Sequence, residues 1–506
     1  DSGTGFVHIA PGHGADDWEL GMANGITVPD TVAADGKFYD HVGLFAGIEV
    51  MAIGTKNKPY YPGNKAVMEK LADCGALLAS AKLLHSYPHS WRSKAPLIFR
   101  NTPQWFISME TTGLRAKALK AISETRFVPE SGRNRLGGMI EQRPDWCVSR
   151  QRAWGVPITV FVNKESCEPM RDTEVFERIV EAVEAEGADA WFASDAQRFL
   201  GDKYKAEDFD QVTDILDVWF DSGCTHAFVL EARNDLQWPA SLYLEGSDQH
   251  RGWFHSSLLE SCGTRGRAPY DAVLTHGFVM AEDGRKMSKS LGNTVLPNDI
   301  VNVNGADILR LWVVGSDYSE DLRIGQEIIK SHTDVYRRLR NTLRFLLGNL
   351  SDFTEADRLP RSQMPELDRW ALHRLWKMDS LLRESCDSFQ FHTLFTELHN
   401  FCASDLSAFY FDIRKDALYC DRADSVNRRA TLTVLDEVFN CLTAWLAPFI
   451  CFTAEEAWLA RYPGDQESVH MRLFPDVPEE WRDDALAEKW STIRRLRRVV
   501  TGALEV

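Results

Sequence analysis

The sequence predicts a multidomain protein with a β-rich opening, an α/β middle and an all-helical tail. Three observations predict this order. Residues 1–90 are rich in glycine and short apolar alternations, short apolar strands alternate with helical stretches from about Trp91 to Asn293, and strand signals fade from Ile300 onward. A chain of 506 residues also exceeds one ordinary domain.

The opening segment reads as strands joined by turns. Apolar and polar residues alternate over Phe6-Val7-His8-Ile9, a pattern typical of a half-buried strand. The first residues, Asp1-Ser2-Gly3-Thr4-Gly5, have neither the basic start nor the apolar core of a signal peptide, and they lack an initiator Met. We therefore expect the chain to be a fragment or a processed piece.

The middle segment alternates strands with helices. Strands are expected at Ser241–Glu245 and Val273–His276, and a helix at Glu174–Glu186 ends before Gly187. One face of that helix carries Val175, Phe176, Ile179, Val180 and Val183. The alternation indicates a parallel sheet, and ligands of such sheets bind at the carboxyl ends of the strands.

The tail is expected to be a helical bundle. Apolar residues at Val335, Leu339, Leu343, Leu346, Leu347 and Leu350 recur at helical spacing. Further helical runs are Glu366–Cys386, Phe391–Tyr410, Ser425–Leu446 and Ala485–Val499, and Leu350–Met364 reads as a loop.

Composition limits the function classes. The apolar runs are too short and too often interrupted by charge for a membrane span. The ten cysteines include no C-x-x-C pair, which argues against a zinc ribbon and a disulfide framework and favours reduced thiols in a cytosolic protein. The net charge of −17 means that any nucleic-acid contact must use local basic patches.

The most informative segment is the loop from Gly284 to Asn293, Gly-Arg-Lys-Met-Ser-Lys-Ser-Leu-Gly-Asn. Three cations and two hydroxyls between glycines are poor core material. Such a loop is either a solvated turn or a site where lysines neutralise charge on the leaving oxygens of a polyphosphate.

A second segment, Tyr243–Phe254, passes from a strand through Gly246 into polar residues and a helix. Gly246 allows close backbone approach, and Asp248 and Gln249 offer partners for a ribose or an amino group. The alternative is that Asp248 simply caps the helix. Trp219 and Trp253 either wall an apolar pocket or belong to the core, and His276 either touches a triphosphate or is structural.

Several other groups have two readings each. The segment Arg143–Gly155 mixes three arginines with aromatic residues, which suits phosphate contact or a salt-bridged strand, and its Cys147 reads as a structural thiol. His8, His13, Asp16 and Asp17 form either a loose metal set or a site that grips an ammonium group. Two arginine groups are either solvated helix faces or phosphate contacts: Arg337, Arg338, Arg340 and Arg344, and Arg494, Arg495, Arg497 and Arg498.

Taken together, these segments resemble the bacterial isoleucyl-tRNA synthetases, a branch of the class I aminoacyl-tRNA synthetases, over nearly the whole chain. The resemblance rests on Lys286–Ser290, on Glu245–Phe254 and on further segments: Ser86–Arg92, Thr102–Phe106, Arg143–Pro157 and Gly305–Trp312. It implies an editing-domain remnant over residues 1–90, a Rossmann-like class I catalytic half over 91–329 and an anticodon-binding bundle over 330–506.

The resemblance also implies an activity and its residues. The enzyme would join isoleucine to tRNA(Ile) through an adenylate made from ATP with Mg²⁺, as a cytoplasmic monomer with no membrane partner and no structural zinc site within this chain. Lys286, Ser288 and Lys289 match the catalytic loop; Glu245, Gly246, Asp248, Gln249 and His276 match the ATP and adenylate positions; Trp219 and Trp253 match the amino-acid pocket. His8 and Asp17 match the site that hydrolyses mischarged valyl-tRNA, needed because one methylene discriminates too weakly. Arg337, Arg338, Arg340 and Arg344 are weaker candidates for tRNA contact.

The sequence departs from the family's pattern in three places. The family's His-x-Gly-His motif and its C-terminal zinc-binding cysteines do not occur in the 506 residues, and serines stand at Ser90 and Ser93, where relatives often carry cysteines. Two alternatives therefore stay open: a valyl- or leucyl-tRNA synthetase, or a tRNA-binding protein without catalytic activity.

Overall fold

The computed structural model describes residues 5–54, 59–82, 84–90 and 93–504. The chain forms two compact units, one of residues 1–108 and 145–218 and the other of residues 109–144 and 219–506. Asp1, Ser2, Gly3 and Thr4 of the predicted opening, and Trp91 and Arg92 of the segment Ser86–Arg92, lie outside the described residues.

The opening of the first unit is less β-rich than its sequence suggests, so that prediction is wrong for the described residues. Its longest elements are helices α1 (Ala15–Ala23) and α2 (Pro62–Asp73), whereas β1 (Ala52–Ile53) and β2 (Pro59–Tyr60) form a short antiparallel pair. Phe6 and Val7 are exposed, so the alternation at residues 6–9 has no buried face that would fix a strand.

The rest of the first unit packs helices against short antiparallel pairs. These pairs are β3 (Phe106–Ile107) with β5 (Trp146–Cys147), β6 (Ser149–Arg150) with β9 (Ile215–Leu216), and β7 (Phe161–Asn163) with β8 (Phe209–Gln211). Helices α5 (Thr173–Glu186), α6 (Ala190–Ala193) and α7 (Ala196–Leu200) follow β7 in sequence. Phe161, Trp191 and Phe199 fill the core between them.

Helix α5 confirms the helix predicted at Glu174–Glu186. Asp172 caps it by accepting a hydrogen bond from the Glu174 backbone N–H over 2.9 Å, and Gly187 ends it with a φ of 86°. The predicted apolar face is only partly buried: Val175 and Ile179 lie in the core, whereas Phe176 and Val180 are exposed.

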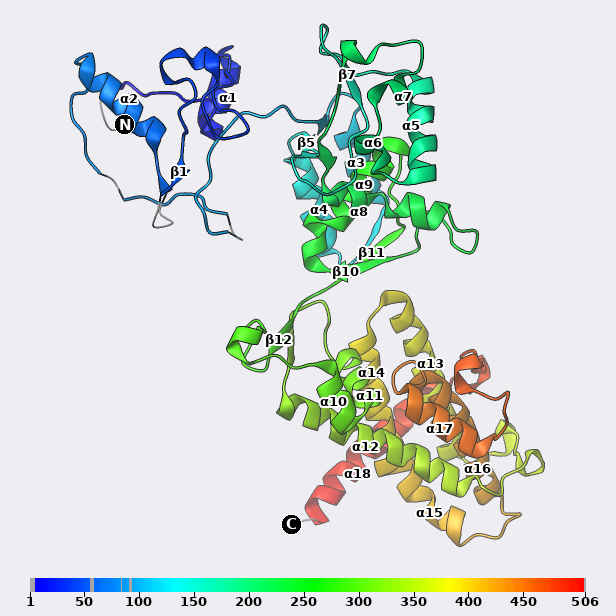
Figure 1. The fold of residues 1–506 in the computed structure, drawn as a ribbon. Helices are drawn as coiled ribbons and strands as arrows, with labels where there is room; N and C mark the ends of the chain where they lie inside the picture. The colour runs from blue at the N-terminus through cyan, green and yellow to red at the C-terminus, as the bar shows by residue number, and fades with distance from the viewer. Residues whose placement is uncertain (1–4, 55–58, 83, 91–92, 505–506) are drawn as a thin grey trace. The chain divides into compact units, whose positions relative to one another are not determined.

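The second unit contains a three-stranded parallel sheet in the order β10 (Tyr243–Gly246), β11 (Ala272–His276) and β4 (Arg126–Val128). Helices α3 (Leu114–Glu124), α4 (Ser131–Glu141) and α9 (Trp253–Thr264) lie close together beside it in Figure 1. The parallel sheet confirms the α/β prediction, and both predicted strands are present. Helix α8 (Val218–Gly223) and a wide helical turn, η3 (His226–Glu231), precede β10.

After β11 the chain forms the small parallel pair β12 (Val279–Ala281) and β13 (Leu322–Ile324), which encloses α10 (Pro297–Asn304) and α11 (Ala306–Val314) in sequence. The remainder is helical, as predicted: α12 (Gln326–Asn349), α13 (Glu366–Ser388), α14 (Phe391–Asn400), η8 (Phe401–Phe411), α15 (Asp412–Tyr419), α16 (Val426–Leu446), α17 (Cys451–Arg461) and α18 (Asp484–Leu504). Figure 1 shows α13, α16 and α17 packed side by side.

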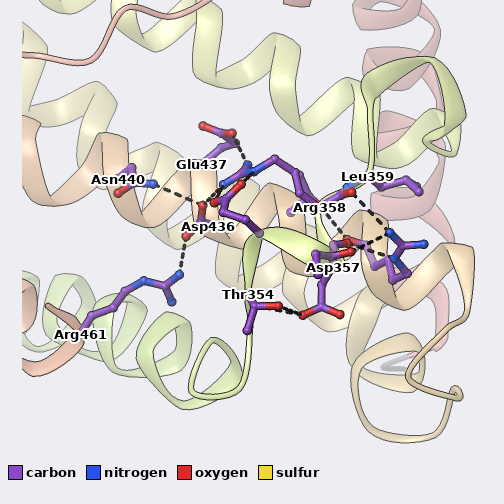
Figure 2. A network of polar contacts seen from close by, with 12 residues as sticks. Thr354, Asp357, Arg358, Leu359, Asp436, Glu437, Asn440 and Arg461 are labelled. Carbon is purple, nitrogen blue, oxygen red and sulfur yellow. Dashed lines mark hydrogen bonds and ion pairs between the residues drawn. The ribbon is translucent and has the colours of Figure 1, made fainter.

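The predicted loop at residues 350–364 is present, with short turns at Glu355–Asp357 and Arg361–Gln363. A buried ionic network fastens it to the bundle (Figure 2). Arg358 binds Asp436 over 2.5 Å and Glu437 over 2.6 Å, and Arg461 binds the second oxygen of Asp436 over 2.5 Å. Burial raises the pKa of Glu437, and the Arg358 guanidinium opposes that rise.

All ten cysteines are free thiols. Within the part of the chain that the structure describes, no helix is both long enough and apolar enough to span a bilayer.

Candidate active site

The ends of two neighbouring parallel strands bring the first candidate residues together. In the register of β10 and β11, Glu245 lies opposite Thr275 and Gly246 lies opposite His276. The Glu245 side chain is exposed, and His276 Nδ1 lies 2.8 Å from the carbonyl oxygen of Gly277. The predicted residues therefore share the carboxyl edge of the sheet, where ligands of open α/β sheets bind.

The turn after β10 is built closely around Gly246. A Cβ atom at this position would lie 2.7 Å from Asp248 Oδ1, so a larger residue would displace that carboxylate. Gln249 Nε2 donates to Asp248 Oδ2 over 3.0 Å, and Gln249 Oε1 accepts from the Trp253 backbone N–H over 3.0 Å. The alternative in which Asp248 caps the helix is wrong, because α9 begins at Trp253 and Gln249 supplies the acceptor at its start.

The two tryptophans lie on either side of Gly252, the residue before α9. Trp219 is 43% exposed, and a Cβ atom at Gly252 would lie 2.9 Å from its ring carbons. Trp253 is half-buried, stacks on Tyr243 with ring centroids 4.1 Å apart, and donates from Nε1 to the Ser222 carbonyl oxygen over 3.1 Å. Trp219 therefore presents an open apolar surface, whereas much of Trp253 is packed.

The lysine-rich loop is folded on itself. Asn293 Oδ1 accepts from the Ser288 backbone N–H over 2.9 Å, and Asn293 Nδ2 donates to the Lys286 carbonyl oxygen over 3.3 Å. The Ser288 and Ser290 hydroxyls lie 2.8 Å apart. Lys286 and Lys289 are exposed, and among the described residues neither ammonium group has a carboxylate partner. Their charge is thus available to an anion.

Met287, between the lysines, anchors this loop. Its side chain packs against the buried cluster that includes Ile300 and Trp312, and its sulfur accepts from the Val295 backbone N–H over 3.4 Å. Neither Met287 nor Asn293 is assigned a role by the sequence pattern. The one available signal for Asn293 is its residue type, since asparagine side chains often form hydrogen bonds with backbone groups in loops.

Asp17 and His8, the predicted editing residues, lie in the first unit. Asp17 Oδ2 accepts from the Ala10 backbone N–H over 2.9 Å, which ties α1 to the segment that follows His8. His8, His13 and Asp16 are exposed. No group of three His, Cys, Asp or Glu side chains in the described ranges is arranged to hold a metal ion, so the metal reading of this cluster has no support.

The arginines of the remaining candidate segments differ in their availability. Arg150 pairs with Asp217, whereas Arg152 and Trp154 are exposed. On α12, Arg337 pairs with Asp334 over 3.0 Å and Arg340 with Glu456 over 3.4 Å. Arg338 and Arg344 are exposed and have no carboxylate partner among the described residues.

The second arginine group belongs partly to the bundle. Arg494 pairs with Asp405 over 2.6 Å and lies 4.9 Å from the ring centroid of Phe409, and Arg497 pairs with Asp412 over 3.2 Å. Cys147 donates to Gln104 Oε1 over 3.4 Å, as expected of a structural thiol.

Two family models match the chain. The model of tRNA synthetases class I (I, L, M and V) matches residues 30–325, and the model of the anticodon-binding domain of tRNA ligases matches residues 368–503. The α/β part and the helical bundle described above therefore correspond to a class I synthetase catalytic domain and an anticodon-binding domain.

Individual relatives agree with these models. The isoleucine–tRNA ligase of Caulobacter vibrioides is 55% identical, with an alignment that covers 100% of this chain and 53% of the relative. That of Pelagibacter ubique is 53% identical and covers 100% of this chain and 55% of the relative. The chain thus spans about half the length of the curated relatives it matches.

Among solved structures, Mycobacterium tuberculosis methionyl-tRNA synthetase in complex with methionyl-adenylate is similar in fold. It has a TM-score of 0.54 at 20% identity, over 78% of this chain and 71% of that chain.

Proposed function

This chain belongs to the class I tRNA synthetases, and on that premise we propose that it is part of an isoleucine–tRNA ligase. The single observation that carries the proposal is the juxtaposition at the sheet edge. Gly246 at the end of β10 lies in register with His276, and two lysines that have no carboxylate partner among the described residues, Lys286 and Lys289, follow along the chain. The likeness to isoleucine–tRNA ligases supports isoleucine over valine or leucine.

The first reaction step joins isoleucine to AMP. A carboxylate oxygen of isoleucine forms a bond to the α-phosphorus of ATP, and the bond to the pyrophosphate oxygen breaks. Charge grows on the leaving pyrophosphate, and Lys286 and Lys289 neutralise it, with the Ser288 hydroxyl as a nearby donor. Mg²⁺ enters with ATP as part of the substrate.

The sheet edge receives the nucleotide and the amino acid. Glu245 contacts the aminoacyl-adenylate, the turn at Gly246 admits its backbone, and Asp248, Gln249 and His276 bind the nucleotide side. Trp219 forms the open wall of the isoleucine pocket, with Trp253 packed behind it. In the second step a terminal hydroxyl of tRNA(Ile) attacks the activated carbonyl, and AMP leaves.

Residues 1–90 contribute to the removal of mischarged valyl-tRNA. Asp17 grips the ammonium group of the misloaded residue, and His8 lies in the same pocket; a carboxylate is the natural partner of that cation. In the proposed arrangement the catalytic part spans residues 91–329 and the tRNA-binding bundle spans residues 330–506. The bundle contacts tRNA(Ile) through arginines of α12, and the enzyme acts as a cytoplasmic monomer.

The test is amino-acid-dependent exchange between ATP and pyrophosphate by the complete protein that carries this sequence. We expect exchange with isoleucine and, about 100-fold less efficiently, with valine, as one methylene allows. Exchange that prefers valine or leucine would assign the chain to those enzymes. Binding of tRNA without exchange for any amino acid would make it a tRNA-binding protein.

A further inference from the structure

Side chains on one face of α9 form hydrogen bonds with the peptide groups that follow Trp219. Trp253 Nε1 donates to the Ser222 carbonyl oxygen over 3.1 Å, and Ser257 Oγ donates to the Gly223 carbonyl oxygen over 2.8 Å. Residues four apart lie on one side of a helix. The helix therefore holds two consecutive carbonyls of the segment 219–224, at a site where the Ser257 side chain is fully buried.

Glu260 continues the same face three residues further along. It is only 8% exposed, and a Cβ atom at position 223 would collide with its Oε1 atom. The carboxyl group is therefore packed directly onto Gly223, at a place where any larger residue would displace it. Trp253, Ser257 and Glu260 together form a polar stripe on α9 that faces residues 222–224.

Trp219 itself lies against the start of the same helix. The Trp219 ring crosses Gly252, the residue from which α9 starts. The Trp219 ring and the peptide groups that follow it therefore both contact α9 or the residue directly before it. Movement of Gly223 relative to Ser257 or Glu260 would change the distance between the Trp219 ring and Gly252, and with it the width of the apolar pocket.

We propose that Ser257 and Glu260 are positioning residues for the amino-acid pocket: they fix the backbone of Gly223 and Cys224 and thereby set the Trp219 wall. This inference rests on the proposed function, because it assigns the pocket to isoleucine. Neither side chain needs to touch the substrate.

The protonation of Glu260 adds a second observable. Burial raises the pKa of Glu260 to about 8, the Cys224 thiol lowers it, and the Asp221 carboxylate raises it. The groups that face it are Asp221 and Cys224 from the Trp219 segment and Tyr243 from β10, while the nearby cation Arg265 is paired with Glu231 over 2.6 Å. As pH rises through about 8, the neutral carboxyl becomes an anion beside Asp221, and repulsion would push the Gly223 segment away.

The test uses the complete enzyme and isoleucine-dependent ATP–pyrophosphate exchange. Ser257→Ala should raise KM for isoleucine about tenfold, the effect of one lost hydrogen bond, and leave KM for ATP and kcat near their original values. The matched control is Ser256→Ala: Ser256 is also a buried serine of α9, but its hydroxyl bonds to the Trp253 carbonyl of its own helix over 3.4 Å. This control should leave all three constants unchanged.

The pH profile separates positioning from general loss of structure. For the parent enzyme we expect KM for isoleucine to rise as pH passes through about 8, and for Glu260→Gln we expect a flat profile, since the amide keeps the shape without the charge. The inference is overturned if Ser257→Ala leaves KM for isoleucine unchanged, or if Glu260→Gln keeps the pH dependence of that KM. It is also overturned if Ser257→Ala and Ser256→Ala impair kcat and both KM values to the same extent. Absence of isoleucine-dependent exchange in the parent enzyme would instead contradict the proposed function.

Discussion

At the scale of single residues, the lysine-rich loop separates cations that are already paired from cations that are available. Arg285 pairs with Asp283 over 2.7 Å, whereas Lys286 and Lys289 have no carboxylate partner within the described residues. We therefore expect Lys289→Ala to slow adenylate formation about 100-fold, the usual effect of removing one group that stabilises transition-state charge.

Single-turnover adenylate formation measures this effect, with Arg285→Ala as the control, because that arginine already neutralises Asp283. We expect the control to keep its rate within about twofold, as befits an exposed ion pair of little energetic weight. An unchanged rate in Lys289→Ala would show that the loop does not hold the leaving pyrophosphate.

Under the proposed function Asp17 has two separable tasks: its Oδ2 atom accepts from the Ala10 N–H, and its negative charge binds the ammonium group of a misloaded residue. Asp17→Asn keeps an acceptor for Ala10 and removes the charge. We expect this variant to activate isoleucine normally and to let valyl-tRNA accumulate, because the ammonium group loses its anionic partner.

Deacylation of valyl-tRNA measures this second prediction, and Asp16→Asn, an exposed carboxylate on the same helix, is its control. Normal clearance of valyl-tRNA by Asp17→Asn would exclude Asp17 as the editing anchor.

Candidate site residues could be predicted from the sequence where a charged or glycine-containing segment resembles a known motif. Residues whose role depends on contacts formed in the folded structure could not be predicted. Lys286, Lys289 and Gly246 were assigned roles because their segments resemble motifs of the synthetase family; a charged loop or a glycine at a strand end also fits a solvated turn. Asn293 and Ser257 were not assigned roles, because the backbone groups they bind become neighbours only after the loop closes and after α9 packs.

At the scale of elements, long amphipathic runs were predictable and short ones were not. Helices α5, α13 and α16 begin and end within two residues of their predicted limits, and α18 begins one residue before its predicted start and ends five residues after its predicted end. A periodic apolar stripe over several turns has few alternatives. The alternation at Phe6–Ile9 spans too few residues to fix a strand. The run predicted at Phe391–Tyr410 divides into α14 and the wide-turn segment η8, a change of helical pitch that periodicity does not reveal.

The network that fastens residues 354–359 to α16 makes a prediction about stability. Asp436 is 3% exposed in its side chain and serves two arginines, Arg358 and Arg461. Asp436→Ala leaves both guanidinium groups without this partner, so we expect it to destabilise the bundle by about 3–5 kcal/mol.

Urea unfolding followed by far-ultraviolet circular dichroism measures this loss. The control is Asp424→Ala, because Asp424 pairs with the exposed Arg422 and its loss should cost about 1 kcal/mol or less. Equal midpoints for the two variants would mean that the buried pairs add nothing beyond an exposed one.

At the scale of the whole molecule, the proposed function requires an excess of acidic residues to coexist with binding to a polyanion, tRNA(Ile). With a net charge of −17, the chain as a whole repels nucleic acid, so affinity for tRNA depends on local cations that are not already neutralised. The α12 arginines differ in this respect: Arg337 and Arg340 form ion pairs with carboxylates, whereas Arg338 and Arg344 have no carboxylate partner among the described residues. Arg344 also lines a surface hollow with Asn341 and Tyr419.

We therefore expect the double variant Arg338→Ala, Arg344→Ala to bind tRNA(Ile) more weakly and with a shallower salt dependence. Each lost phosphate contact should lower the slope of log K against log salt by about one, because fewer counterions are released. Filter binding across a salt series measures both quantities. The charge-matched control is Arg422→Ala, Arg482→Ala, which removes two exposed arginines already paired with Asp424 and Asp484. If both double variants shift the affinity equally, net charge rather than the α12 face governs binding; if the α12 variant alone flattens the slope, this face contacts the tRNA backbone.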